Sequence, residues 1–192
     1  MPALAALITL AAAAQASTPA PLFAAFKAAC HDVQQFDRVG AAASAAGWTP
    51  VAEQDADPRI AAIVAKGRDA MRKEEPDAKI AGQLFRHKFD GRDVWLATSR
   101  VEFKIDGKAM WGNGCRAYDL DAPSAVPART LTGWVGQPPT GVQGNAGAVK
   151  TLWEPWHPGV TLEITYVPRD NPLGAQFGIQ GLILVSQAIG GF

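Results

Sequence analysis

Residues 84–120 read LFRHKFDGRDVWLATSRVEFKIDGKAMWGNGCRAYDL, and this stretch decides the fold. Two Asp-Gly dipeptides, at 90–91 and 106–107, separate three segments in which apolar and polar residues alternate. Alternation with a period of two is typical of β-strands, and Asp-Gly favours the type I′ turn of a tight hairpin. The stretch therefore predicts an antiparallel meander over 84–89, 92–105 and 108–120. If both turns form, Thr98 pairs with Cys115.

The middle strand also predicts which face of the meander is buried. One face carries mostly apolar side chains and the other carries charged ones, since alternate residues point to opposite faces. The first set is Trp95, Ala97, Ser99, Val101, Phe103 and Ile105, and the second is Arg100, Glu102 and Lys104. We expect a sheet with one buried face and one solvent-exposed face.

The remainder of the C-terminal part continues the strand pattern. Alternating residues predict strands at 149–153 and 160–166, and the apolar run 181–189 predicts a buried strand, with a helix as the alternative. A short helix is expected within 123–135. The segment 136–147, GQPPTGVQGNAG, has the composition of a loop.

The N-terminal part has helical spacing instead. Apolar residues recur every four positions in 21–31, and an Ala-rich helix over 36–46 should end at Gly47. A third helix should begin at Asp57-Pro58, because aspartate is a good N-cap and proline fits the first helical turn. Helices at about 20–75 and strands at about 80–192 predict an α+β domain, with N-terminal helices packed on a C-terminal antiparallel sheet.

Composition limits the class of protein. The chain has 192 residues, of which 48% are hydrophobic and 19% charged, and its 18 basic and 18 acidic side chains cancel. This is the composition of one globular domain rather than of a disordered chain. The absence of net charge and of a basic stripe argues against a nucleic-acid partner.

The first sixteen residues predict a signal peptide. Residues 3–14, ALAALITLAAAA, are about as long as the apolar core of such a peptide, and Ala14-Gln15-Ala16 is a small-x-small cleavage pattern. No Lys or Arg precedes the apolar run, and the alternative is a buried Ala-rich helix. We expect residues 1–16 to be removed, a single domain over 17–192, no transmembrane segment after cleavage, and a periplasmic or secreted location.

The two cysteines, Cys30 and Cys115, predict one disulfide bond. An even cysteine count in an exported protein is typical of a disulfide. A zinc site would need histidines at ligand spacing, but those at 31, 87 and 157 are scattered. Thiol exchange or haem attachment would need a C-x-x-C motif, which the sequence does not contain. Cys30 falls on the apolar face of the first predicted helix, which suits a buried bond.

Three short stretches resemble parts of exported bacterial proteins of unknown function. They are Phe26-Lys27-Ala28-Ala29-Cys30, Ala45-Ala46-Gly47-Trp48 and Cys115-Arg116-Ala117-Tyr118-Asp119, together with the signal peptide. The resemblance covers most of the mature chain and implies export and a disulfide. It implies no activity.

Residues that could carry catalysis are few. The sequence has no G-x-S-x-G, no S-x-x-K and no phosphate-binding glycine motif. The glycines of Trp111-Gly112-Asn113-Gly114 more readily allow a bulge or close packing of Trp111. Three carboxylates, Asp119, Asp121 and Glu163, could form an acidic site only if the fold brings them together. We therefore assign no catalytic residue, cofactor or metal ligand from the sequence.

The hairpin Trp153–Gly159, WEPWHPG, is the best candidate for a partner contact. Trp153 continues an inward alternation, whereas Trp156 lies between two prolines in an expected six-residue connection, with His157 beside it. A tryptophan on a stiff loop suits contact with a protein or a sugar ring. The alternative is that Trp156 folds back and caps the core.

These observations predict a non-catalytic binding or interaction module of the cell envelope, whose partner would be an envelope protein or a glycan. The alternatives are a periplasmic hydrolase or transferase with an acidic site, and an inhibitor of an envelope enzyme. A deep cleft with converging carboxylates would favour the enzyme. A filled core with flat faces would favour the module.

Overall fold

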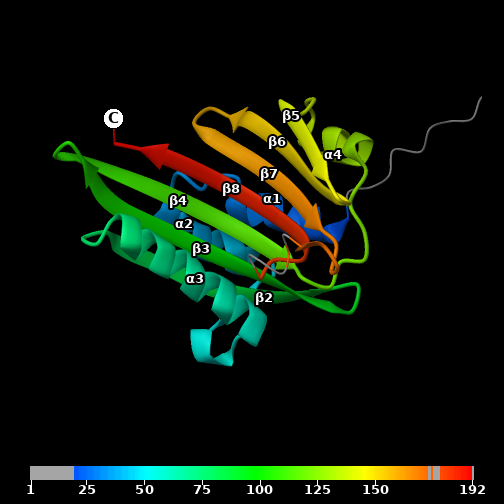
Figure 1. Cartoon of the computed structure of the whole chain (residues 1–192), viewed down its shortest axis with the longest axis horizontal. Helices are drawn as coiled ribbons and strands as arrows, with labels where there is room; N and C mark the ends of the chain where they lie inside the picture. The colour runs from blue at the N-terminus through cyan, green and yellow to red at the C-terminus, as the bar shows by residue number, and fades with distance from the viewer. Residues whose placement is uncertain (1–19, 173, 175–177, 192) are drawn as a thin grey trace, which may run out of the picture.

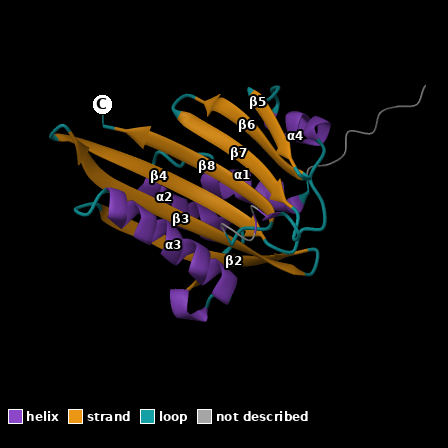
Figure 2. Cartoon of the chain, viewed as in Figure 1, coloured by secondary structure: helices purple, strands orange, loops and turns teal. Residues whose placement is uncertain are grey.

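The computed structural model describes residues 20–172, 174 and 178–191. Within these residues, eight antiparallel strands form one sheet in the order β1-β2-β3-β4-β8-β7-β6-β5 (Figure 1). The predicted α+β fold is confirmed, with helices largely N-terminal and the sheet C-terminal (Figure 2). The expected signal peptide, residues 1–16, lies outside the described residues.

The predicted meander is confirmed, and its strands are β2 (Lys79–Phe89), β3 (Arg92–Ile105) and β4 (Lys108–Asp119). Both Asp-Gly dipeptides form the turns, with φ of 48° and 78° at the first and 51° and 78° at the second. Positive φ at both central residues is the mark of a type I′ turn. Thr98 pairs with Cys115, as the turn positions predict.

The second half of the sheet joins the meander through β8 (Gly181–Gly190), which lies between β4 and β7. The apolar run therefore forms a strand and not a helix. The other members are β7 (Val160–Val167), β6 (Ala148–His157) and β5 (Gly141–Asn145).

Two edge strands differ from the sequence prediction. β5 falls within the segment 136–147 that was predicted as a loop, and β1 (Thr49–Val51) was not predicted. Both are short and pair with one neighbour, so their glycine or proline content is tolerated at the sheet edge. Tertiary pairing rather than local strand propensity forms them.

The helices begin and end close to the predicted positions. They are α1 (Pro21–Cys30), α2 (Phe36–Ala45), α3 (Pro58–Glu74) and α4 (Ala128–Val135), with a short 3-10 turn, η1 (Glu53–Asp55). Gly47 follows α2 with a φ of 90°, and the Asp57 carboxylate accepts a hydrogen bond from the Arg59 backbone N–H at the start of α3. Both capping predictions are therefore confirmed.

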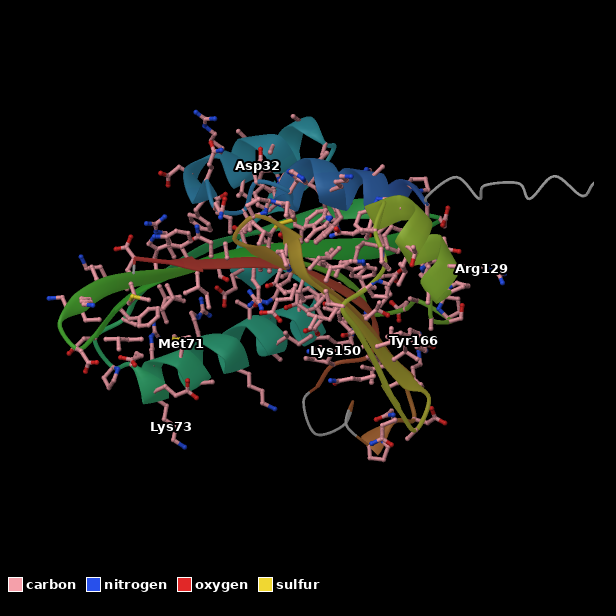
Figure 3. All side chains as sticks on the ribbon, turned by 90° about the horizontal axis from the view of Figure 1, so that it is seen from above. Asp32, Met71, Lys73, Arg129, Lys150 and Tyr166 are labelled. Atoms are coloured by element: carbon pink, nitrogen blue, oxygen red, sulfur yellow. A yellow bond between two sulfur atoms is a disulfide. The ribbon has the colours of Figure 1, made fainter. Side chains whose placement is uncertain are left out.

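Helices cover both faces of the meander, with α1 and α2 on one side of the sheet and α3 on the other (Figure 3). The expectation of one solvent-exposed face is wrong for the first half of β3. There, Val94 and Leu96 join the core beneath α1 and α2, while Trp95 and Ala97 join a second core with α3. The predicted charged face, Arg100, Glu102 and Lys104, lies in the second half of the strand.

The disulfide Cys30–Cys115 joins the end of α1 to β4, with the two Cα atoms 5.6 Å apart. Both cysteines are fully buried. Side chains of the sheet also bind carbonyl groups at the last residue of α1 and in the turn that follows it. Ser186 Oγ donates to the Cys30 carbonyl at 2.9 Å, and Asn113 Nδ2 donates to the Val33 carbonyl at 3.0 Å.

We expect removal of the disulfide to lower the free energy of unfolding substantially. The bond closes a separation of 85 residues, which corresponds to about 4 to 5 kcal/mol in the chain-entropy model. Cys30→Ala and Cys115→Ala should each show this loss in urea denaturation, and the reduced wild type should match them. Thiols that alkylate readily in the folded, untreated protein would contradict the assignment.

Candidate functional site

Helix α3 packs closely against the sheet only near its N-terminal end. Of its 17 residues, Ile60 is the one that is buried, in a core shared with Trp95, Tyr118 and Leu120. Ile63, Val64 and Met71, which line the side of the helix toward the sheet, are only half-buried. The helix therefore stands away from the sheet along most of its length.

Arg59 fastens this N-terminal end by ion pairs. Its guanidinium binds Asp57, with Nη2 2.7 Å from Oδ2, and Asp121, with Nη1 3.2 Å from Oδ1. These hydrogen bonds lower the pKa of both carboxyl groups. Asp121 also pairs with Arg169 at 2.8 Å.

A cavity of about 1420 Å³ lies between the rest of α3 and the sheet, and it continues around the edge of β2 to α2. Its walls are mostly apolar. Met71 lies on the side of α3 that faces the sheet, whereas Lys73 points away (Figure 3). The other apolar side chains lining it on this side include Ile63, Val64, Ile80, Leu84 and Val101.

The cavity opens along the outer edge of β2. Strand β1 pairs only with residues 84–86, so residues 79–83 have no strand neighbour on that side within the described chain. Arg68 of α3 and Glu53 of η1 stand at the cavity wall, with Nη1 2.8 Å from Oε2. This hydrogen bond lowers the pKa of Glu53. The pair joins η1 to the middle of α3.

Arg116 is the one charged residue among the described strand residues that line the cavity. It is half-buried, and its Nη1 donates to Ser99 Oγ at 3.0 Å. Tyr118 lines the cavity two residues further along the same face. Burial raises the pKa of this phenol, and the positive charge of Arg116 partly opposes that shift. On the face beneath α3, the sheet side of the cavity is thus mostly apolar, with the Arg116 cation and the hydroxyl groups of Ser99 and Tyr118.

The sequence analysis did not identify Arg116 as a site residue, although it quoted the stretch Cys115–Asp119 that contains it and the Gly-x-Gly just before it. The Gly-x-Gly of β4 was predicted to serve a bulge or the packing of Trp111. Instead, the glycine against Trp111 is Gly190 of β8, and Gly114 lies beneath the Arg116 guanidinium. The available signal was the alternation along β4, which places the two on one face.

The structure brings Trp156 and His157 together with His31 at the end of α1. The rings of His31 and His157 stack with centroids 4.2 Å apart, and His157 Nε2 lies 2.8 Å from the His31 carbonyl oxygen. The Trp156 indole is 8% exposed and packs near Trp134. This burial favours the core-capping alternative, and the partner contact stays a prediction.

The expected six-residue connection of this hairpin is wrong. Strand β6 continues to His157 with a register shift after Trp153, and Pro158-Gly159 alone forms the turn. The irregular strand turns Trp156 inward. Trp153 is fully buried, and its indole N–H donates to the Gln137 carbonyl at 3.0 Å.

The three carboxylates of the alternative acidic site are each held by a different basic partner. Asp119 binds Arg92, with Nη2 3.0 Å from Oδ2, while Asp121 binds Arg59 and Arg169. Glu163 pairs with Lys150. Among the described residues, no group of three or more His, Cys, Asp or Glu side chains could hold a metal ion.

Comparisons with known proteins returned no match to a family model, a curated protein or a solved structure. None of the described helices has the length and apolar character needed to cross a membrane. The site must therefore be interpreted from its own geometry.

We expect the Arg59 ion pairs to make stability depend on pH. The folded pKa values of Asp57 and Asp121 lie below their unfolded values near 4, so the pairs stabilise the fold above that pH. This contribution is lost as pH falls through the lowered values. Arg59→Met should cost less than about 1 kcal/mol at pH 7, because the groups are partly exposed.

Urea denaturation at pH 7 and pH 3 measures this effect. The difference in the free energy of unfolding between wild type and Arg59→Met should be smaller at pH 3 than at pH 7. Arg72→Met, in the exposed last turn of α3, should have the wild-type free energy of unfolding at both pH values. An undiminished difference at pH 3 would refute the ion-pair explanation.

We expect both hairpin tryptophans to contribute to stability. Trp153→Ala should lower the free energy of unfolding by roughly 3 to 5 kcal/mol, because it removes a fully buried ring and its hydrogen bond. Trp156→Ala should lower it by about 2 to 4 kcal/mol if the indole caps the core. Chemical denaturation measures both. A loss below about 1 kcal/mol for Trp156→Ala would instead favour the partner contact.

Proposed function

We propose that this protein is an exported, non-catalytic binding protein that holds an elongated apolar ligand between α3 and the sheet. The observation that carries the proposal is the cavity with mostly apolar walls, whose volume of about 1420 Å³ includes the part that continues around the edge of β2 to α2. Ligand pockets are typically concave, apolar and roughly 300 to 1,000 Å³. This cavity exceeds that range and therefore has room for a large or extended ligand.

Packing considerations support a ligand rather than a loosely built core. Protein interiors leave few voids larger than a water molecule, and the face beneath α1 and α2 meets that standard with many fully buried residues. On the opposite face, α3 buries only Ile60 and leaves apolar side chains such as Val64 and Met71 half-buried. A bound apolar chain would remove these side chains from water.

The enzyme alternative receives less support. A cavity is present, but the carboxylates of Asp119, Asp121 and Glu163 do not line it and are engaged by separate basic residues. General acid-base chemistry needs a carboxyl group positioned at the substrate. Two carboxylates of the described chain line the cavity wall: Asp37, which lies on α2, and Glu53, which is bound by Arg68.

Export to the periplasm or beyond remains part of the proposal. The disulfide supports it, because such bonds persist in oxidising compartments and are rare in the cytosol. N-terminal sequencing or intact mass of the protein expressed with its own N-terminus tests the expected start near Ser17.

The ligand proposal predicts that filling the cavity from α3 blocks binding without unfolding the protein. Gly67 lines the cavity, and a Cβ at this position meets no atom within 4 Å. Gly67→Trp should place an indole in the cavity and should not lower stability, since glycine is a poor helix residue. Fluorescence titration with N-phenyl-1-naphthylamine, a neutral apolar dye, should show saturable binding to wild type and at least about tenfold weaker binding to the variant.

Gly133→Trp is the matched control. Gly133 also lies in a helix and has open space around its Cβ, but it belongs to α4 and is not part of the cavity. This variant should bind the dye as the wild type does. Equal binding by Gly67→Trp and wild type would show that the dye does not occupy the cavity and would refute the proposal.

A further inference from the structure

The face of the sheet beneath α3 is built from rows of side chains that cross β2, β3 and β4. One row contains Leu84, Ala97 and Arg116, and the next contains Gly82, Ser99 and Gly114. Gly114 leaves room above the sheet for the neighbouring arginine, whereas at Gly82 a Cβ would lie 2.4 Å from the Thr98 carbonyl oxygen. Arg116 and Ser99 thus form a polar patch on the mostly apolar cavity wall.

The Arg116 guanidinium occupies part of this space. A Cβ at Gly114 would lie 2.3 Å from Arg116 Nη1 and 3.0 Å from Ser99 Oγ, so a larger residue at this position would displace the guanidinium. The guanidinium therefore lies along the cavity floor, hydrogen-bonded to Ser99. Strand packing alone gives no reason for this combination of glycine and arginine.

Arg116 differs from the other half-buried arginines of the described chain in lacking a carboxylate partner. The others are Arg68, Arg92 and Arg100, which bind Glu53, Asp119 and Glu102 respectively. Arg116 binds only the Ser99 hydroxyl among the described residues. A partly desolvated cation without a counter-ion is unfavourable, and an anion supplied by a ligand would remove that cost.

Two hydroxyl groups stand beside this cation. Ser99 Oγ accepts from Arg116 and keeps its own proton for donation. The Tyr118 hydroxyl, on the same face, makes no hydrogen bond within the described chain. Together with the guanidinium, these hydroxyls can donate several hydrogen bonds to one planar anion, as in arginine–carboxylate pairs.

We propose that Arg116 binds the carboxylate end of a long-chain amphipathic ligand whose apolar chain lies along α3. This assignment rests on the ligand-binding function proposed above. One unpaired cation matches one negative charge. From Arg116, the apolar wall continues through Ile80 and Val101 of the next row and Met71 of the helix. The ligand class is therefore a long-chain carboxylic acid.

Competition between two ligands with the same chain tests the head-group assignment. Dodecanoate and 1-dodecanol, each below its micelle-forming or solubility limit, are titrated against bound N-phenyl-1-naphthylamine. Wild type should bind dodecanoate at least about tenfold more tightly than the alcohol, since a charged hydrogen-bonded pair contributes that much or more. Equal affinity for the two would overturn the role of Arg116 and leave the proposed cavity function in place. Failure of the wild type to bind the dye or either competitor would overturn both.

Arg116→Met should remove the preference for dodecanoate while it leaves the affinity for 1-dodecanol within about twofold. Arg100→Met is the matched control, because Arg100 is also half-buried in the sheet but pairs with Glu102 outside this cavity. A preference that persists in Arg116→Met would overturn the proposal. Ser99→Ala provides a second variant if Arg116→Met does not fold, and it should weaken dodecanoate binding more than alcohol binding.

Discussion

The register between β3 and β4 is the constraint on which the rest of the structure depends. The turn at 106–107 pairs Thr98 with Cys115, and this places Cys115 on the face of α1 and Arg116 on the face of α3. A slip of one residue would exchange the two faces, since side chains alternate along a strand. Such a slip would prevent the disulfide from forming and would point Arg116 into the densely packed core beneath α1.

The two faces of the sheet consequently serve different purposes. Beneath α1 and α2, the disulfide, the Ser186 hydrogen bond to the end of α1, the Asn113 hydrogen bond to the turn after it, and a dense apolar core fix the helices to the sheet. Beneath α3, the contact is limited to one end, where Ile60 packs and Arg59 forms its ion pairs. Regions with few buried apolar contacts open at lower free energy than the core. The α3 layer is therefore the part of the fold best able to admit a ligand.

The sequence predicted the elements whose signals are local. The Asp-Gly turns, the Asp57 cap and the Gly47 stop each depend on a few neighbouring residues, and the Thr98–Cys115 pairing follows from the turns. The disulfide was predicted separately, from the two cysteines of an expected exported chain. The edge strands β1 and β5 depend on a neighbouring strand and carry little signal of their own. The register shift of β6 between Trp153 and His157 could not be predicted either, because it depends on the packing of the Trp156 ring against His31.

The cavity could not be predicted from the sequence because it results from a distance between two layers. The spacing of Ile60, Ile63, Val64, Gly67 and Met71 predicts an apolar helix face, but not how far that face stands from the sheet. That distance follows from the residues opposite, where Gly82 and Gly114 supply no side chains and Arg116 supplies a charge. Gly82 has no room for a side chain, because its Cβ would lie 2.4 Å from the Thr98 carbonyl oxygen, and a larger residue at Gly114 would displace the Arg116 guanidinium. Glycine and arginine at these three positions therefore leave α3 without the apolar contacts that α1 makes, at a cost in packing energy in the empty protein. The disulfide-linked face offsets that cost, so the fold can keep the loosely packed, charged face on which the proposed ligand binding depends.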